Sequence, residues 1–139
     1  MTTREWLGRA RTIEREINAL IRAKEEARAS VLRVTQSYQA DVVQSTKDPH
    51  KNDRLVVLES LIDGKVDELV AVKTEITEAI SHIPDGKQRT VLYDFYVRCI
   101  SLEQTAVEIH YSYANVKKLR AKAIRSLEEV YPQLSIGTC

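Results

Sequence analysis

The feature that most constrains the fold is a long apolar stripe near the start of the chain. Between Thr3 and Tyr38 there is no proline, and Gly8 is the only glycine. This stretch predicts one amphipathic helix about 50 Å long, at ~1.5 Å per residue, which needs an equally long partner. Apolar residues recur at alternating steps of four and three, interrupted only at Lys24: Trp6, Ala10, Ile13, Ile17, Leu20, Ala27, Val31, Val34 and Tyr38.

A second stripe supplies that partner. The polar segment 41–52 contains Asp48-Pro49 and predicts a break, with Asp53 as the N-cap of the next helix. Pro84-Asp85-Gly86 ends this second helix. The two stripes predict an antiparallel helical hairpin, a coiled coil, over residues 1–84. The second stripe is interrupted at Lys65 and comprises Leu55, Leu58, Ile62, Leu69, Val72, Ile76 and Ile83.

The third section, residues 85–134, predicts a small domain of three short helices. The first holds Val91, Leu92, Phe95 and Tyr96. Ser101 is the expected N-cap of the second helix, with Gln104 in the capping-box position, and the helix runs to about Ile109. Ser112 is the expected N-cap of the third, which runs to about Val130. Residues 135–139 are expected to form a disordered tail. No segment favours a strand, so the predicted class is all-α.

The last two of these helices carry the strongest functional pattern. Ala106 is small enough for two helices to approach, and His110 stands at the turn, where a positive φ is often needed. The apolar set is Leu102, Ala106, Ile109, Tyr111, Val116, Leu119, Ala123 and Leu127. Between Ser112 and Leu127 there are five basic residues and no acidic one. A cationic helix on a compact support predicts a DNA-binding helix-turn-helix; the alternative is a merely solvated basic face.

The candidate DNA-binding residues all lie on or beside the basic helix. Tyr113 is expected to touch a base or a phosphate, and Asn115 is expected to read adenine unless it serves as a cap or faces solvent. Arg120, Lys122 and Arg125 are expected at phosphates along the flanks. The full set is Ser112, Tyr113, Ala114, Asn115, Lys117, Lys118, Arg120, Lys122 and Arg125.

Composition restricts the other classes of function. The net charge of the whole chain is only +1, so its positive charge is local. No run reaches the roughly 18 apolar residues of a membrane span, and the N-terminus is unlike a signal peptide. Cys99 and Cys139 suggest no disulfide framework, and His50 and His82 lack partners at zinc spacing. We expect a cytoplasmic protein without cofactor, metal or catalytic site.

Self-association is expected from the second helix. It carries apolar residues beyond its stripe, which would form a large exposed patch if left bare. We expect either a two-fold homodimer through the hairpin to cover them, or the C-terminal helices to fold back over them. These residues are Val57, Leu61, Val66, Val70 and Ile80.

The C-terminal section resembles a sigma-70 region 4 domain. Arg89-Thr90-Val91-Leu92, Phe95-Tyr96 and Ser101 to Ala106 look like its start, and His110-Tyr111-Ser112 through Leu127 resemble its recognition helix. With the helical pair before it, nearly the whole chain resembles phage-encoded late-gene transcription regulators of the RinA/ArpU type. The resemblance implies sequence-specific binding to double-stranded DNA and activation of phage or prophage genes.

Two departures qualify the resemblance. His110 replaces the usual glycine or asparagine of the turn, and no sigma region 2 precedes the domain. The hairpin takes that place and is expected to serve dimerisation or contact with RNA polymerase. Two rival functions remain. One is a DNA-packaging subunit like a phage small terminase, which also joins a helix-turn-helix to a coiled coil. The other is a structural coiled-coil adaptor.

Overall fold

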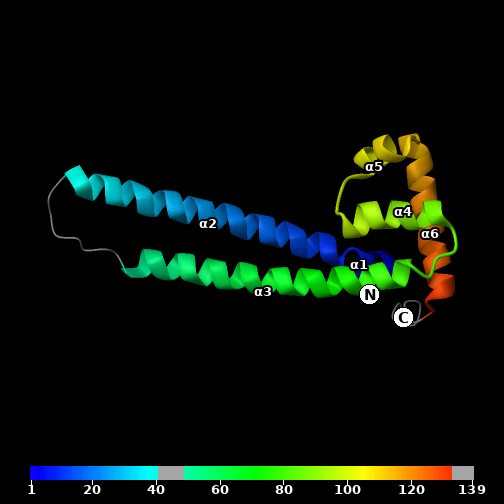
Figure 1. Ribbon diagram of the computed structural model, residues 1–139, viewed down its shortest axis with the longest axis horizontal. Coiled ribbons are helices and arrows are strands. Elements are labelled where there is room, and N and C mark those ends of the chain that lie inside the picture. The colour runs from blue at the N-terminus through cyan, green and yellow to red at the C-terminus, as the bar shows by residue number, and fades with distance from the viewer. Residues whose placement is uncertain (41–48, 133–139) are drawn as a thin grey trace. The chain divides into compact units, whose positions relative to one another are not determined.

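The computed structural model describes the backbone of residues 1–40 and 49–132, and the side chains of residues 1–33 and 53–132. Every regular element in these ranges is a helix, which confirms the predicted all-α class (Figure 1). The predicted tail at residues 135–139 lies outside them. The elements are α1 (Thr3–Leu7), α2 (Arg9–Ala40), α3 (Pro49–Ile80), α4 (Gly86–Leu92), the π-helix η1 (Tyr93–Val97), α5 (Leu102–Ile109) and α6 (Tyr113–Val130).

The chain packs as two compact units. One, here called the two-helix unit, spans Arg15–Glu68. The other, the core unit, combines Met1–Glu14 with the chain from Leu69 onward. The cuts fall inside α2 and α3, whereas the sequence pattern suggested a boundary after residue 84. Consequently, the ends of both long helices belong to the same unit as the three C-terminal helices.

In the two-helix unit, ion pairs join α2 to α3. Lys24 Nζ lies 3.3 Å from Glu59 Oε1, and Lys65 Nζ lies 3.0 Å from Glu16 Oε2. The Glu16 carboxylate also raises the pKa of Lys65. These are the two lysines that interrupt the apolar stripes. The order of the pairs along the chain shows that the two segments run in opposite directions.

The core unit holds two clusters of buried apolar side chains. The larger, here called the main cluster, draws on α1, α2, α3, α4, η1 and α6. Its buried members are Leu7, Ala10, Ile76, Ala79, Ile80, Ile83, Leu92, Tyr96, Ala123, Ile124 and Leu127. The smaller, the α5–α6 cluster, consists of Val91, Leu102, Ala106 and Val116. Helix α6 contributes to both clusters, so its position depends on the first residues of the chain as well as on α5.

The long helices begin differently from the sequence-based expectation. The first is divided at Gly8, which separates α1 from α2. Asp53 is not an N-cap, because α3 already begins at Pro49 and residues 49–52 are helical. Proline suits the first position of a helix because its φ is already helical. Its missing N–H costs nothing there, since an N–H at that position has no acceptor within the helix. The rest of the predicted break, residues 41–48, lies outside the described ranges.

The region after α3 also differs in detail. Helix α3 ends at Ile80 rather than Ile83. Two backbone hydrogen bonds that each span three residues follow it, from His82 N–H to Ala79 O and from Ile83 N–H to Ile80 O. The Asp85 carboxylate then caps α4 by accepting from Lys87 N at 3.0 Å. The single short helix predicted here has two parts, α4 and the wider π-turn η1.

Candidate nucleic-acid interface

Helices α5 and α6 are separated by a tight turn whose caps agree with the predicted ones. The Ser101 hydroxyl accepts from Gln104 N at 3.0 Å, and the Ser112 hydroxyl accepts from Asn115 N at 3.2 Å. His110 adopts the left-handed conformation, with φ 60° and ψ 39°, and Tyr111 N–H donates to Ala106 O. The prediction that a histidine accepts a positive φ at this turn is confirmed.

One face of α6 docks on the supporting helices. Val116 is fully buried beside Leu102 and Ala106 of α5 and Val91 of α4. Leu119 packs at the edge of the same cluster. Further along α6, the predicted apolar positions Ala123 and Leu127 are buried as well, but in the main cluster. The docked side of α6 is therefore defined along most of its length.

The opposite face of α6 is rich in exposed cations. With 3.6 residues per turn, Lys118, Lys122 and Arg125 fall on the half of the helix opposite Val116, and all three are exposed. Ala114, between them and the turn, is exposed as well. Within the described part of the chain, none of the three cations enters an ion pair.

The described lysines of α2 and α3 behave differently. Lys24, Lys65 and Lys73 each lie within 4 Å of a carboxylate, at 3.3, 3.0 and 3.7 Å from Glu59, Glu16 and Glu14. The long helices thus neutralise these lysines internally. The three cations on the outer face of α6 have no such partner among the described residues.

Tyr113 and Lys117 form a pair beside this outer face. Tyr113 is 44% exposed, and Lys117 Nζ lies 5.2 Å from the centre of its ring. The aromatic ring attracts the ammonium group and orients it near the start of α6. Both residues are available to a ligand that approaches the N-terminal end of the helix.

Arg120 occupies a different position from the one expected at the flank. Its side chain is partly buried, with the guanidinium carbon 5.1 Å from the centre of the Phe95 ring. Arg11 of α2 approaches the same ring at 4.0 Å and donates from Nη1 to the carbonyls of Phe95 and Ile100. Arg120 therefore faces the interior of the core unit. At 3.6 residues per turn, Arg120 lies on the same side of α6 as Val116, whereas Lys118 lies on the opposite side.

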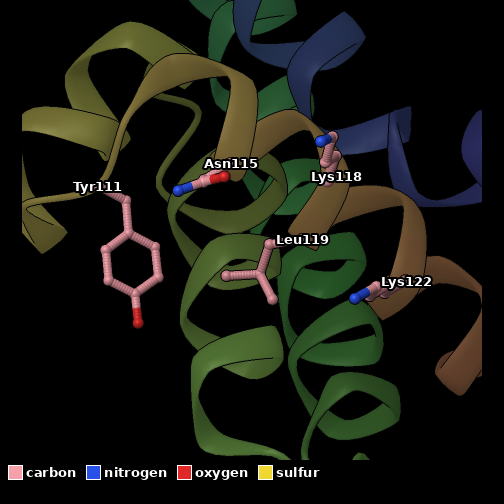
Figure 2. A pocket seen from close by; sticks show the side chains of 5 residues that line it. All are labelled: Tyr111, Asn115, Lys118, Leu119 and Lys122. Atoms are coloured by element: carbon pink, nitrogen blue, oxygen red, sulfur yellow. The ribbon is translucent and has the colours of Figure 1, made fainter.

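A shallow hollow of about 340 Å³ opens beside α6 (Figure 2). Its lining residues from α6 are Asn115, Lys118, Leu119 and Lys122, and the Tyr111 ring lines it from the turn before α6. Its lining contains two ammonium groups, an amide and a phenol, and no carboxylate. These groups are suited to a negatively charged ligand.

Sequence reasoning missed one cation close to this hollow. Lys87, in the first turn of α4, has its Nζ 5.6 Å from the centre of the Tyr111 ring. Its hydrogen bond with the Tyr111 hydroxyl raises the pKa of Lys87, and the nearby Asp85 carboxylate acts in the same direction. Lys87 is distant from α6 in the sequence, and only the fold brings it to Tyr111.

An ion-pair network fixes the connection between η1 and α5. Arg98 Nη1 lies 3.0 Å from Asp94 Oδ1 and 2.8 Å from Glu108 Oε2. Arg98 lowers the pKa of Glu108, and the two carboxylates raise the pKa of Arg98. The acidic charge of Glu108 is thereby balanced beside the helix that supports α6.

The described residues contain neither a membrane-spanning helix nor a cluster of metal ligands. None of their helices has both the length and the apolar character needed to cross a membrane. Nor do three or more His, Cys, Asp or Glu side chains come together there in a way that could hold a metal ion. In comparisons with known proteins, no family model, no curated protein and no solved structure matches this chain.

Proposed function

We propose that this protein is a sequence-specific regulator of transcription that binds double-stranded DNA through α5 and α6 as a helix-turn-helix. The observation that carries the proposal is the contrast in lysine pairing. Lys118 and Lys122 are exposed without a carboxylate partner among the described residues, whereas Lys24, Lys65 and Lys73 are paired. Exposed cations on one helix face are what attraction to DNA phosphates requires.

In this proposal α6 enters the major groove with its outer face. Ala114 and Ala121 lie toward the bases, whereas Lys118 reaches a phosphate at the edge of the groove. Lys122 and Arg125 contact phosphates, and the Tyr113–Lys117 pair contacts the backbone near the start of the helix. The Ser112 hydroxyl caps α6 by accepting from Asn115 N, and Arg120 supports the helix through Phe95.

The resemblance to sigma-70 region 4 and to phage late-gene regulators of the RinA/ArpU type supports a role in activating phage or prophage genes. Such a regulator works in the cytoplasm without a cofactor or catalytic site. It either contacts RNA polymerase directly or presents the DNA to it.

The long helices α2 and α3 are proposed to form an antiparallel coiled-coil hairpin that dimerises the protein. Val57, Leu61 and Val66 are exposed on α3, as is Val70, in support of this idea. Ile80 does not belong to the expected bare surface, since it is fully buried in the main cluster. A second copy would cover part of the remaining surface and present two α6 helices to half-sites about 34 Å apart.

Capture of bound DNA across the genome of the host tests the function directly. Enrichment at one or a few promoters is the expected result. Enrichment at a packaging start site would favour the small-terminase alternative, and absence of enrichment would favour a structural adaptor. Light scattering on the purified protein adds a second criterion, since a dimer fits transcriptional control and a ring fits packaging.

A further inference from the structure

We propose that the hollow lined by Tyr111, Asn115, Lys118, Leu119 and Lys122 seats one phosphate group, and that Lys87 contributes positive charge to this seat from α4. The inference rests on the proposed DNA binding and specifies its contact beyond α6. The phosphate belongs to the DNA backbone beside the groove that α6 enters.

The arrangement of charge favours an anion here. Lys118 and Lys122 are four residues apart on one helix, a spacing at which like charges repel each other. Among the described residues neither has an ion-pair partner, and no carboxylate lines the hollow. A bound anion would relieve this repulsion.

The chemistry of the hollow favours a phosphate over a carboxylate or a halide. The Tyr111 hydroxyl and the Asn115 amide add neutral hydrogen-bond donors to the two ammonium groups. A phosphodiester has several acceptor oxygens that accommodate donors from more than one direction. Tyr111 links the two helices of the seat, since its ring lines the hollow and also contacts Lys87.

Lys87 makes this inference testable apart from α6. Each phosphate contact that is lost reduces the slope of log K against log salt by about 0.9. Because Lys118 and Lys122 still contact the phosphate, we expect Lys87→Gln to reduce the slope by up to that amount and to lower affinity by up to about fivefold at 0.15 M salt. Arg28→Gln, which removes one exposed positive charge from α2, is the matched control and should leave the slope unchanged.

A double-variant comparison sharpens the test. If Lys87 and Lys118 act on the same phosphate, the loss in Lys87→Gln plus Lys118→Gln is smaller than the product of the two single losses. Tyr111→Phe keeps the ring against Lys87 and removes only the hydroxyl, so it should weaken binding less than Lys87→Gln does. Circular dichroism melts verify that every variant is folded.

The outcomes separate this inference from the proposed function. If Lys118→Gln weakens DNA binding and Lys87→Gln behaves like Arg28→Gln, the phosphate seat is wrong and the DNA-binding function stands. If the wild-type protein binds no duplex, the proposed function fails, and titration with inorganic phosphate decides the seat. Saturable NMR shifts at Tyr111 and Asn115, lost in Lys87→Gln, would then assign it to free phosphate, and their absence would overturn it.

Discussion

The two compact units differ in how they bury apolar side chains. In the two-helix unit, Ile17 and Ala27 are the buried apolar residues among the described side chains. The same unit exposes Ile21, Leu32, Val56, Val57, Leu61 and Val66. The core unit, in contrast, fully buries large side chains such as Leu7, Ile80, Leu92 and Leu127. The core unit buries more because several elements surround each apolar side chain there.

This difference indicates where the stability of a single chain resides. A fully buried Val or Leu side chain contributes about 1.5–3 kcal/mol, whereas an exposed ion pair contributes about 0–1 kcal/mol. Lys24–Glu59 and Lys65–Glu16 are partly exposed pairs of the second kind. A partner that covered Val57 and Leu61 would therefore stabilise the two-helix unit, and the core unit is the part that positions α6.

The largest effect is expected from Val116→Asp. Val116 is fully buried in the α5–α6 cluster, and an unpaired buried carboxylate costs several kcal/mol. DNA binding should be lost, while circular dichroism should still report the long helices of the two-helix unit. Val107→Asp introduces the same charge on α5 at a site that is 68% exposed, so it should remain stable. Equal stability of the two variants would show that α6 is not docked through Val116.

A cavity in the core unit should cost nearly as much. Leu127→Ala removes a fully buried side chain from the main cluster and should destabilise the protein by about 2–5 kcal/mol. Leu61→Ala alters a side chain that is 49% exposed on α3 and should cost a single chain much less. Urea unfolding at low protein concentration measures both. If Leu61→Ala were the more damaging variant there, the contrast between the units would be reversed.

A moderate gain is expected at Gly64. This glycine lies inside α3, and a Cβ built on it meets no atom within 4 Å. Gly64→Ala should therefore raise the stability of the two-helix unit by about 1 kcal/mol, because alanine loses less backbone entropy in a helix. Gly8→Ala is a useful comparison, since its Cβ would lie 3.2 Å from the Arg4 carbonyl oxygen and should give less benefit. Thermal melts followed by circular dichroism provide both values.

The smallest effect concerns the Cys99 thiol in the core unit. Burial, followed by a hydrogen bond with Glu14, raises its pKa from 9.0 to about 11. Between pH 9 and about pH 11, the Cys99 thiol keeps its proton in the folded protein but loses it in the unfolded chain. The stability contributed by the thiol is thus complete below about pH 9 and is lost as the pH rises toward 11. The free energy of unfolding, measured between pH 9 and pH 11, should fall more steeply for wild type than for Cys99→Ser. Parallel curves for the two proteins would contradict this prediction.

The features predicted well from the sequence are local ones. Ser101, Ser112 and His110 act within a few residues of themselves, so the bounds of α5 and α6 and the left-handed turn were predictable. Asp53 was misassigned because Pro49 is an equally strong helix start, and a local signal does not choose between the two. The π-helix η1 left no recognisable pattern in the sequence.

The features missed depend on packing between distant segments. The sequence gives Arg120 as one of several basic residues on a helix. Helical spacing does not reveal that its guanidinium contacts the Phe95 ring, or that Arg11 contacts the same ring. Lys87 approaches Tyr111 only once α4 has packed against α6. The burial of Ile80 likewise depends on the C-terminal helices sharing a core with α1 and α3.

The most direct test of the central claim, that the outer face of α6 binds DNA, is the salt dependence of duplex affinity. Any duplex serves, since phosphate contacts do not depend on base sequence. One variant replaces three exposed cations of α6 together by glutamine: Lys118, Lys122 and Arg125. Its control replaces three exposed cations of α2 in the same way: Arg22, Arg28 and Arg33. We predict that the α6 variant loses about 1.8 from the slope of log K against log salt, at about 0.9 for each of two phosphates, one held by Lys118 with Lys122 and one by Arg125. The control should keep the wild-type slope. Equal slopes in the two variants would contradict the account.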